Sequence, residues 1–447
     1  MKIFTQSILA AMLIWASGLM MLSCNKNVKR AGVNPPFEKV RIAYTEHEIV
    51  PAQGKEIKLP NGTVITVPEN AFKDADGNLV TETVTLKYRE FHTPAEIIAS
   101  GIPMLYDSAG ETHCFESAGM FDINAATKAD KPVFIADDRN ITVKMGSFRS
   151  GDDFNFYRFE EGENNWNYLG IKPAEPNVEK QQKTATLGTT PAKPIKPQTA
   201  NKNAAVFDLK VNYTKFPELK EFASVMWQYA GTDAASNPEK NKWLFDKNWE
   251  SVTLKPENAD EGIYKLKLKT SGRDFETLVR PVLRGENYNK AMADFKKKAD
   301  VYNARMDEAL KLRRQADLLR TFQLKNFGMY NWDRIYKQPY VVPVAANFKY
   351  DDNYSTKINA IYLISGNERT VMPFDPQYNN TIYFDPNTRN CLLAILPGDK
   401  IAVFGANDFK ALDIQKIKSN GDYTFNMKTL DKVIETPEDL DEILKNI

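Results

Sequence analysis

The sequence predicts a mainly β protein with two β-sandwich-like units, a proline-rich linker between them and a long α-helix in the second unit. Three observations predict this fold class. Short runs of alternating apolar and polar residues, bounded by turn residues, recur before residue 171 and after residue 205. Five prolines fall between residues 172 and 204. Neither Gly nor Pro interrupts residues 286–322.

The first residues have the pattern of a secretory signal. Lys2 supplies a positive start, and a nearly unbroken apolar run of about 14 residues extends from Ile8 to Met21. A membrane-spanning helix needs about 20 apolar residues, so a transmembrane segment is the weaker interpretation. We therefore expect residues 1–23 to be a signal peptide that is removed.

The stretch Leu22-Ser23-Cys24 resembles the lipobox of bacterial lipoproteins, although Met21 stands where such boxes usually carry Leu. The resemblance implies cleavage before Cys24, whose sulfur would carry a diacylglycerol and whose amine is often acylated too. Two or three acyl chains suffice for stable membrane attachment, whereas one chain does not. The alternative is an ordinary secreted protein with a chance cysteine at position 24.

Residues 24–38 are expected to form a lipidated tether that ends in Pro35-Pro36. A second resemblance, over residues 50–145, is described below and points to Bacteroidetes-type bacteria. In those bacteria, acidic residues just after the lipid-bearing cysteine favour display on the cell surface. Here Lys26, Lys29 and Arg30 are basic. The expected location is therefore the outer membrane, with its periplasmic face favoured over the cell surface.

Residues 39–171 contain the first predicted β-sandwich. Apolar residues alternate through Thr63–Val67, Val80–Tyr88 and Phe154–Phe159, and Asp74–Asn78 is an Asp-Gly type of turn signal. Short strands at regular spacing with turn residues between them are typical of a sandwich.

Within this region, Leu59–Phe72 (LPNGTVITVPENAF) resembles the opening of a ZU5-type domain. Three later pieces, Tyr88–Phe91, Ser100–Met104 and Ser117–Phe121, resemble a variant found in uncharacterised envelope lipoproteins of Bacteroidetes-type bacteria. ZU5 domains are β-sandwiches that mediate protein interactions without catalysis. The resemblance covers roughly residues 50–145, implies an interaction role and transfers no catalytic residue.

Residues 172–204 are expected to be a semi-extended Pro/Lys/Thr-rich linker, and residues 205–447 a β-rich domain. Strand patterns there include Val206–Val211, Tyr264–Lys269 and the core-type runs Trp227–Tyr229 and Trp243–Phe245. A final helix is predicted near Pro437–Asn446, because its acidic first turn suits a helix N-terminus.

The long helix is predicted over residues 286–322. Its apolar positions, spaced 4 and 3 residues apart in turn like a heptad seam, are Met292, Phe295, Ala299, Tyr302, Met306 and Ala309. The helix is either one piece or a helical hairpin folded back near Leu312. It packs on its own sheet or, in the alternative interpretation, seeks a partner helix.

Charge and cysteine content exclude some classes of protein. Removing residues 1–23 removes only Lys2, which leaves 59 − 1 = 58 basic residues against 58 acidic ones. A formally neutral chain argues against a nucleic-acid-binding protein. Beyond Cys24 only Cys114 and Cys391 remain, and two separate thiols are favoured over a disulfide.

No motif predicts an active site, a metal or a cofactor. His113 and Cys114 are adjacent, so on a strand they point to opposite faces. Asp74–Asn78 lacks the spacing of an EF-hand loop, since its Gly stands fourth. The ligand-type residues of Glu46–Glu48 and Arg89–His92 lack the spacing of a zinc site.

Three residues outside the anchor are candidates for modification or binding. Asp107-Ser108-Ala109 resembles the O-glycosylation acceptor of Bacteroidetes-type bacteria, which makes Ser108 a candidate for O-glycosylation. Tyr330 and Trp332 are candidates for a ligand or partner surface, although such aromatics more often pack in a core.

Two functions follow from the sequence. The first is a non-enzymatic, lipid-anchored interaction or scaffold module that binds another envelope protein. The alternative is a carbohydrate or peptidoglycan binding protein, or a hydrolase of such polymers, which the aromatic content of the second half suggests.

Overall fold

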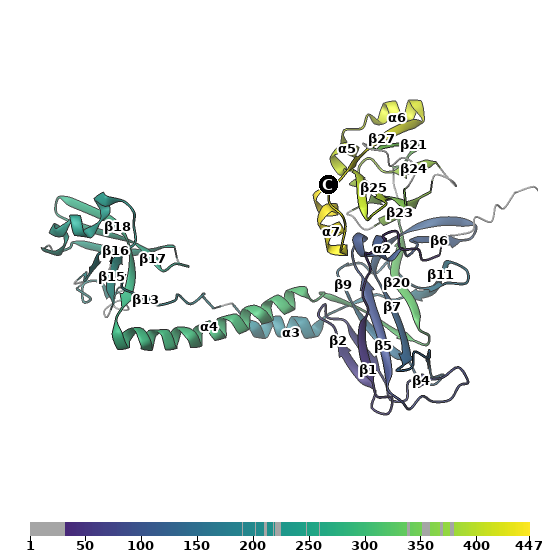
Figure 1. Ribbon diagram of the computed structural model, residues 1–447, viewed down its shortest axis with the longest axis horizontal. Helices are drawn as coiled ribbons and strands as arrows, with labels where there is room; N and C mark the ends of the chain where they lie inside the picture. Colours follow the sequence, from purple (N-terminus) through teal and green to yellow (C-terminus); the bar gives the residue numbers. More distant parts are fainter. Residues whose placement is uncertain are drawn as a thin grey trace, which may run out of the picture. The chain divides into compact units, whose positions relative to one another are not determined.

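The computed structural model describes residues 32–447 apart from 190, 202, 210–211, 218, 220–224, 247, 259, 338–339, 351–357, 367–369 and 376–379. The expected signal peptide and Cys24 lie outside the described residues. The chain is mainly β, as predicted. It divides into unit 1, which contains residues up to 59, 63–176 and 317–447, and unit 2, which contains residues 60–62 and 177–316 (Figure 1).

This division differs from the expected domain of residues 205–447. After the long helix the chain returns to unit 1, where β19 (Leu318–Leu324) pairs with β9 (Ile141–Ser147). The next strand, β20 (Gly328–Ile335), pairs with β7 (Glu111–Thr127). Since β9 and β7 precede the expected linker and pair with β19 and β20, residues 317–447 belong with the first unit, and unit 2 is an insertion.

The largest sheet of unit 1 has fourteen strands in the order β11-β10-β20-β7-β23-β22-β25-β26-β27-β21-β24; in addition, β5 and β6 each pair with β7, and β1 pairs with β5. Besides β7 and β20, the strands of this sheet are β1 (Thr45–Ile49), β5 (Val84–Phe91), β6 (Leu105–Ser108), β10 (Asn155–Glu160), β11 (Asn165–Ile171), β21 (Val342–Tyr350), β22 (Ala360–Ser365), β23 (Thr370–Phe374), β24 (Thr381–Phe384), β25 (Asn390–Leu396), β26 (Lys400–Phe404) and β27 (Asp422–Thr429).

A second sheet of unit 1 has the order β12-β19-β9-β3-β2, with β2 (Lys55–Lys58), β3 (Val64–Val67) and β12 (Ala174–Pro176). Two short strands, β4 (Phe72–Lys73) and β8 (Phe134–Ile135), form a separate antiparallel pair. One buried cluster takes side chains from both large sheets, among them Ile65, Val143, Phe121 and Trp332. Burial of apolar side chains from both sheets therefore holds them together.

Helices pack on the large sheet of unit 1. α2 (Pro94–Ser100) begins at Thr93, whose capping box with Glu96 satisfies the first backbone amides. It lies against α7 (Pro437–Asn446), which confirms the predicted final helix. Two short helices, α5 (Ala406–Lys410) and α6 (Ile414–Asn420), precede β27.

Unit 2 contains a six-stranded sheet in the order β14-β15-β18-β17-β16, with β13 beside β18. Trp243–Phe245 was predicted as a core strand but lies in the 3₁₀ helix η4 (Lys242–Asp246). Leu244 is buried, so this stretch contributes to the core as a helical turn and not as a strand. The elements of this sheet and its turns are β13 (Gln198–Thr199), β14 (Val206–Phe207), β15 (Met226–Tyr229), β16 (Ser251–Asn258), β17 (Ile263–Thr270), β18 (Arg273–Leu283), η2 (Ala234–Ser236) and η3 (Pro238–Lys240).

The long helix is one piece, α4 (Gly285–Arg314), so the hairpin alternative is wrong. It ends eight residues before the predicted limit, because Leu318–Leu324 forms β19 instead. The expected linker is also partly ordered: α3 (Val178–Leu187) lies side by side with α4 (Figure 1). Among the described helices, none is both long and apolar enough to cross a membrane.

The end of the expected tether is packed into unit 1. Phe37 and Val40 are buried in the core that also contains α2 and α7 residues. Glu38 and Lys39 donate backbone hydrogen bonds to the Asp399 carboxylate. The described part of the tether therefore belongs to the folded unit from about residue 34, because its apolar residues find a buried site there.

Candidate functional site

An open hollow of about 610 Å³ lies on unit 1 between β6 and the hairpin of β10 and β11. β6 and β11 lie close together without pairing as strands (Figure 1). We call this feature the hairpin hollow. Its lining residues are Tyr106, Asp107, Glu160, Gly162, Glu163, Asn165, Trp166, Asn167 and Tyr168.

Two tight hairpins place these residues. Ala109 and Gly110 both have positive φ angles, of 52° and 85°, as the two central residues of a type I′ hairpin turn require. They reverse the chain between β6 and β7. The turn between β10 and β11 ends at Asn164, whose φ is 48°. Asn and Asp tolerate this left-handed conformation better than most residues, so the acidic turn 160–164 can close tightly.

The floor of the hairpin hollow is aromatic. The ring of Tyr106 stacks on Phe115 with centroids 5.3 Å apart and meets Tyr157 edge-on at 5.2 Å. Tyr157 also contacts the ring of Tyr168 at 5.7 Å. Burial raises the pKa of the Tyr157 hydroxyl to about 12, so it stays protonated at neutral pH. Because Tyr106 and Tyr168 rest on buried rings, their positions are fixed by packing.

Polar contacts join β6 to the neighbouring hairpin. Asp107 N donates to Asn165 Oδ1 at 3.2 Å, and Asn165 Nδ2 donates back to the Asp107 carbonyl at 3.4 Å. Trp166 is buried and its Nε1 donates to the Pro103 carbonyl at 2.8 Å. These contacts hold the two walls of the hairpin hollow at a fixed separation.

The lining is acidic. Asp107, Glu160 and Glu163 contribute three carboxylates, and the lining contains no Lys or Arg. Arg158 pairs with Glu160 at 2.9 Å from outside the lining, and Thr112 donates to Asp107 at 2.5 Å. Glu163 is exposed. The hairpin hollow therefore favours cationic or hydroxyl groups over anions.

β11 is an edge strand with an exposed apolar surface. Among the described residues it pairs with β10 alone. Tyr168 is 48 % exposed and Ile171 63 %, and Leu169 is also exposed. Edge strands are usually protected by Lys, Pro or a covering element, and β11 contains neither Lys nor Pro. Its free edge is suited to accept an added strand.

The structure does not place Tyr330 and Trp332 on a surface. They are 2 % and 0 % exposed and belong to the core shared by the two sheets of unit 1. Their rings pack on Phe156 at 5.4 Å and 4.3 Å. As partner-surface candidates they are wrong, because both side chains point inward from β20 and are covered by the second sheet.

The two candidates for modification stay predictions. Cys24 lies outside the described residues. Ser108 is half-buried at the end of β6, directly before the hairpin turn and next to the lining residue Asp107. A glycan on Ser108 would therefore stand beside the hairpin hollow.

The remaining candidates show no catalytic arrangement among the described residues. Cys114 and Cys391 are both free thiols. Burial raises the pKa of Cys114 to about 11 and that of Cys391 to about 12, which keeps both thiols protonated and poorly nucleophilic. His92 Nε2 lies 2.6 Å from the buried Glu90 carboxylate, but His113 reaches only Glu111, at 4.0 Å.

Charged side chains in unit 1, some buried and some partly exposed, form a structural network. Arg334 joins Glu116 at 2.9 Å and Asp153 at 2.7 Å, while Arg149 also pairs with Glu116. Arg320 is buried, and its guanidinium donates to Ser147 Oγ and to three carbonyl oxygens between residues 149 and 172. The Glu116 pairs tie β20 and the segment after β9 to β7, and the Arg320 contacts tie β19 to residues 147–172, so the network stabilises the fold.

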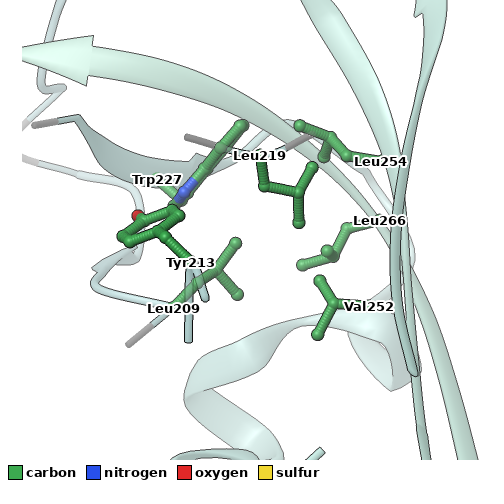
Figure 2. A pocket seen from close by; sticks show the side chains of 7 residues that line it. All are labelled: Leu209, Tyr213, Leu219, Trp227, Val252, Leu254 and Leu266. Carbon is green, nitrogen blue, oxygen red and sulfur yellow. The ribbon is translucent and has the colours of Figure 1, made fainter. Parts of the chain in front are cut away.

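A small apolar space lies among core side chains of unit 2 (Figure 2). It measures about 10 Å³, which is room for about one water molecule. Its lining is Leu209, Tyr213, Leu219, Trp227, Val252, Leu254 and Leu266. An apolar space of this size is a packing gap, too small for an organic ligand.

Among the described residues, no group of three or more His, Cys, Asp or Glu side chains is arranged to hold a metal ion. Comparison with known proteins adds no assignment: no family model, no curated protein and no solved structure matches the chain.

Sequence reasoning missed the hairpin hollow. The strands Phe154–Phe159 and Trp166–Leu169 and the acidic residues between them were visible in the sequence. Nothing in that pattern showed that Tyr106 and Asp107, more than fifty residues earlier, face the same turn. The juxtaposition depends on side-chain bonds of Asn165 and Trp166, which no local pattern reveals.

Proposed function

We propose that the chain is a lipid-anchored cell-envelope protein that acts as a non-enzymatic interaction or scaffold module. One observation carries the proposal: the open hairpin hollow lies beside the unprotected apolar edge of β11. An edge strand that exposes Tyr168, Leu169 and Ile171 to solvent is an interaction or aggregation hazard unless a partner covers it.

The ZU5 resemblance supports the same role. Ile65, Val67, Ala71 and Phe72 of the resembling stretch all enter the core that joins the two sheets of unit 1. We infer that these two sheets correspond to the ZU5-like β-sandwich, whose family role is protein interaction. The proposed location is the periplasmic face of the outer membrane, with lipid on Cys24.

The anchor is tested with Cys24→Ser in the native host. The wild-type chain should incorporate labelled palmitate and sediment with membranes, because two or more acyl chains make attachment stable. The variant should lose both properties. A wild-type chain that takes up no label would contradict the lipoprotein assignment.

The interaction role is tested by photo-crosslinking in intact cells. A photoreactive residue at Asn167, which lines the hairpin hollow and is exposed, should capture one envelope protein in stoichiometric amount. The same group at Asp76, exposed in the turn 74–78, is the control. Equal background capture at both positions would argue against the scaffold role.

A carbohydrate or peptidoglycan ligand is the second candidate. It is favoured by the two tyrosine rings and by the amides of Asn165 and Asn167 in one open hollow, since sugars combine ring stacking with hydrogen bonds. On a glycan array, Tyr168→Ala should abolish any signal. Tyr383→Ala, at a tyrosine that is 49 % exposed elsewhere on unit 1, should leave it unchanged. An array without signal would remove this candidate.

A further inference from the structure

The described chain begins at the rim of the hairpin hollow. Gly32 is the first described residue, and a Cβ built on it would lie 2.9 Å from Asn164 Oδ1. Asn164 closes the turn between β10 and β11 and is followed by the lining residue Asn165. From this rim the chain passes the end of α2, where Asn34 N donates to the Gly101 carbonyl at 3.1 Å.

The length of chain before Gly32 limits how far the hairpin hollow lies from the membrane. Cys24 precedes Gly32 by 32 − 24 = 8 residues. Eight residues span at most about 28 Å, at about 3.5 Å per residue. Resting on the proposed lipid anchor at Cys24, this length places the rim of the hairpin hollow within about 28 Å of the bilayer surface.

The chemistry of the lining selects the group that binds there. Arg158 pairs with Glu160 at 2.9 Å and Thr112 donates to Asp107, so the exposed Glu163 is the carboxylate best placed to attract a Lys or Arg side chain and to repel an anionic lipid headgroup. The rings of Tyr106 and Tyr168 add faces for cation–π contact. The free edge of β11 offers backbone donors and acceptors to an extended chain.

We propose that the hairpin hollow binds a Lys- or Arg-bearing extended segment of a membrane-associated partner protein. The segment lies along β11 and inserts a cationic side chain between Tyr168 and Glu163. Charge complementarity sets the class of segment, and the short connection to Cys24 sets its position next to the membrane.

The proposal is tested with the full lipidated chain on neutral phosphatidylcholine vesicles. The probe is a fluorescent peptide of alternating Lys and Val residues, with an alternating Glu and Val peptide for comparison. Only the Lys peptide should bind, and more weakly as salt increases. Glu163→Gln should weaken binding about two- to fivefold, as for an exposed ion pair, and Tyr168→Leu by a similar factor.

Glu161→Gln is the matched control, because Glu161 is exposed in the same turn but does not line the hairpin hollow. It should change binding less than about 1.5-fold, the smallest effect expected of an exposed charge pair. Equal losses of peptide binding for Glu161→Gln and Glu163→Gln, or binding of the Glu peptide, would overturn the proposal.

The position next to the membrane is tested by fluorescence quenching. Nitroxides attached to lipid headgroups should quench a fluorophore at residue 163 more strongly than one at residue 76, and the reverse order would also overturn the proposal.

Crosslinking from Asn167 separates this inference from the proposed function. Capture of a basic segment of an envelope protein supports both. Capture of an acidic or uncharged segment overturns the inference and leaves the scaffold function standing. Capture of residues 25–31 of the same chain, which carry Lys26, Lys29 and Arg30, shows that the occupant is the chain itself and overturns the partner. Peptide binding as expected without a captured protein contradicts the scaffold function and the partner protein together, and leaves standing only the preference of the hairpin hollow for a basic segment.

Discussion

Asp399 holds the backbone of Glu38 across 361 residues of sequence, with Glu38 N donating to Asp399 Oδ1 at 2.6 Å. The other carboxylate oxygen accepts from Lys39 N at 2.9 Å. Asp399 is buried and has a φ of 57°, a conformation that costs free energy unless its surroundings enforce it. The contact therefore fixes the segment that follows the expected membrane tether.

Replacing Asp399 should release this segment. Asp399→Ala removes both acceptors and should lower the local stability of residues 37–40 by about 3 kcal/mol, because two hydrogen bonds to a charged group are lost. Asp399→Asn keeps one acceptor and tolerates positive φ, so it should cost about half as much. Hydrogen exchange of the amides of residues 38 and 39 measures the effect. Unchanged protection in Asp399→Ala would contradict the clamp.

Gly101 allows the same segment to pass the end of α2. A Cβ at Gly101 would lie 2.1 Å from the Asn34 carbonyl carbon and 2.3 Å from Pro35 N. Gly101→Ala should therefore lower the free energy of unfolding by about 3 kcal/mol or more, through overpacking and a φ of 69°.

Gly110→Ala is the matched control, because its φ is 85° and nothing lies within 4 Å of its added Cβ. It should cost only the conformational strain, about 1 kcal/mol. Thermal unfolding of the full chain compares the two variants, and equal losses would mean that the close approach at Gly101 has no energetic consequence.

The sequence could predict elements whose pattern is local. The helix Pro437–Asn446 and the strand around Phe154–Phe159 occur where an acidic first turn and an alternating pattern indicated them. The unit boundaries could not be predicted, because β19 pairs with β9 and β20 pairs with β7 across about 170 to 220 residues of sequence, and strand periodicity does not encode a partner. The Asp399 clamp was likewise invisible, since a single Asp after a Gly carries no motif.

Long-range pairing also explains why the aromatic candidates were misplaced. Tyr330 and Trp332 stand on one face of a strand, and that face is buried only because the second sheet covers it. By contrast, the exposed Tyr168 lies on β11, which among the described residues pairs with β10 alone. The same kind of sequence pattern therefore gave a core residue in one strand and a surface residue in another.

Arg320 should resist conservative replacement. Its guanidinium donates to four oxygen atoms and lies 5.0 Å from the Phe154 ring, and burial lowers its pKa without removing the charge. A Lys ammonium cannot reproduce the planar set of donors of the guanidinium. Arg320→Lys should therefore lower the free energy of unfolding, measured in urea, by about 2–4 kcal/mol. Arg139→Lys, at an exposed arginine, should change stability by less than about 0.5 kcal/mol. A similar effect of both substitutions would count against the buried network.

The two thiols should be slow to react. With their pKa values raised to about 11 and about 12 by burial, Cys114 and Cys391 hold little thiolate at pH 8. Titration of the Cys24→Ser chain with a thiol reagent should show both groups reacting rapidly only after unfolding. Rapid reaction in the native state, or a mass shift on reduction that reveals a disulfide, would contradict this arrangement.

Asp333 should make unit 1 less stable as pH rises. The side chain is 0 % exposed, and burial raises its pKa well above the usual value of 3.8, so the folded state holds a proton that the unfolded state releases. The stability that this group contributes is therefore complete below about pH 4 and falls as pH rises towards the folded pKa, by up to about 1.4 kcal/mol per pH unit.

The variant Asp333→Asn tests this pH dependence. Asn331 Nδ2 donates to Asp333 Oδ2 at 2.6 Å, and the side-chain amide oxygen introduced by Asp333→Asn would preserve that hydrogen bond. Asp333→Asn should thus gain stability over the wild type between pH 4 and pH 8 in urea unfolding, while the exposed control Asp76→Asn follows the wild-type curve. Parallel curves for Asp333→Asn and the wild type would show that Asp333 ionises in the fold, and that its charge is compensated inside unit 1.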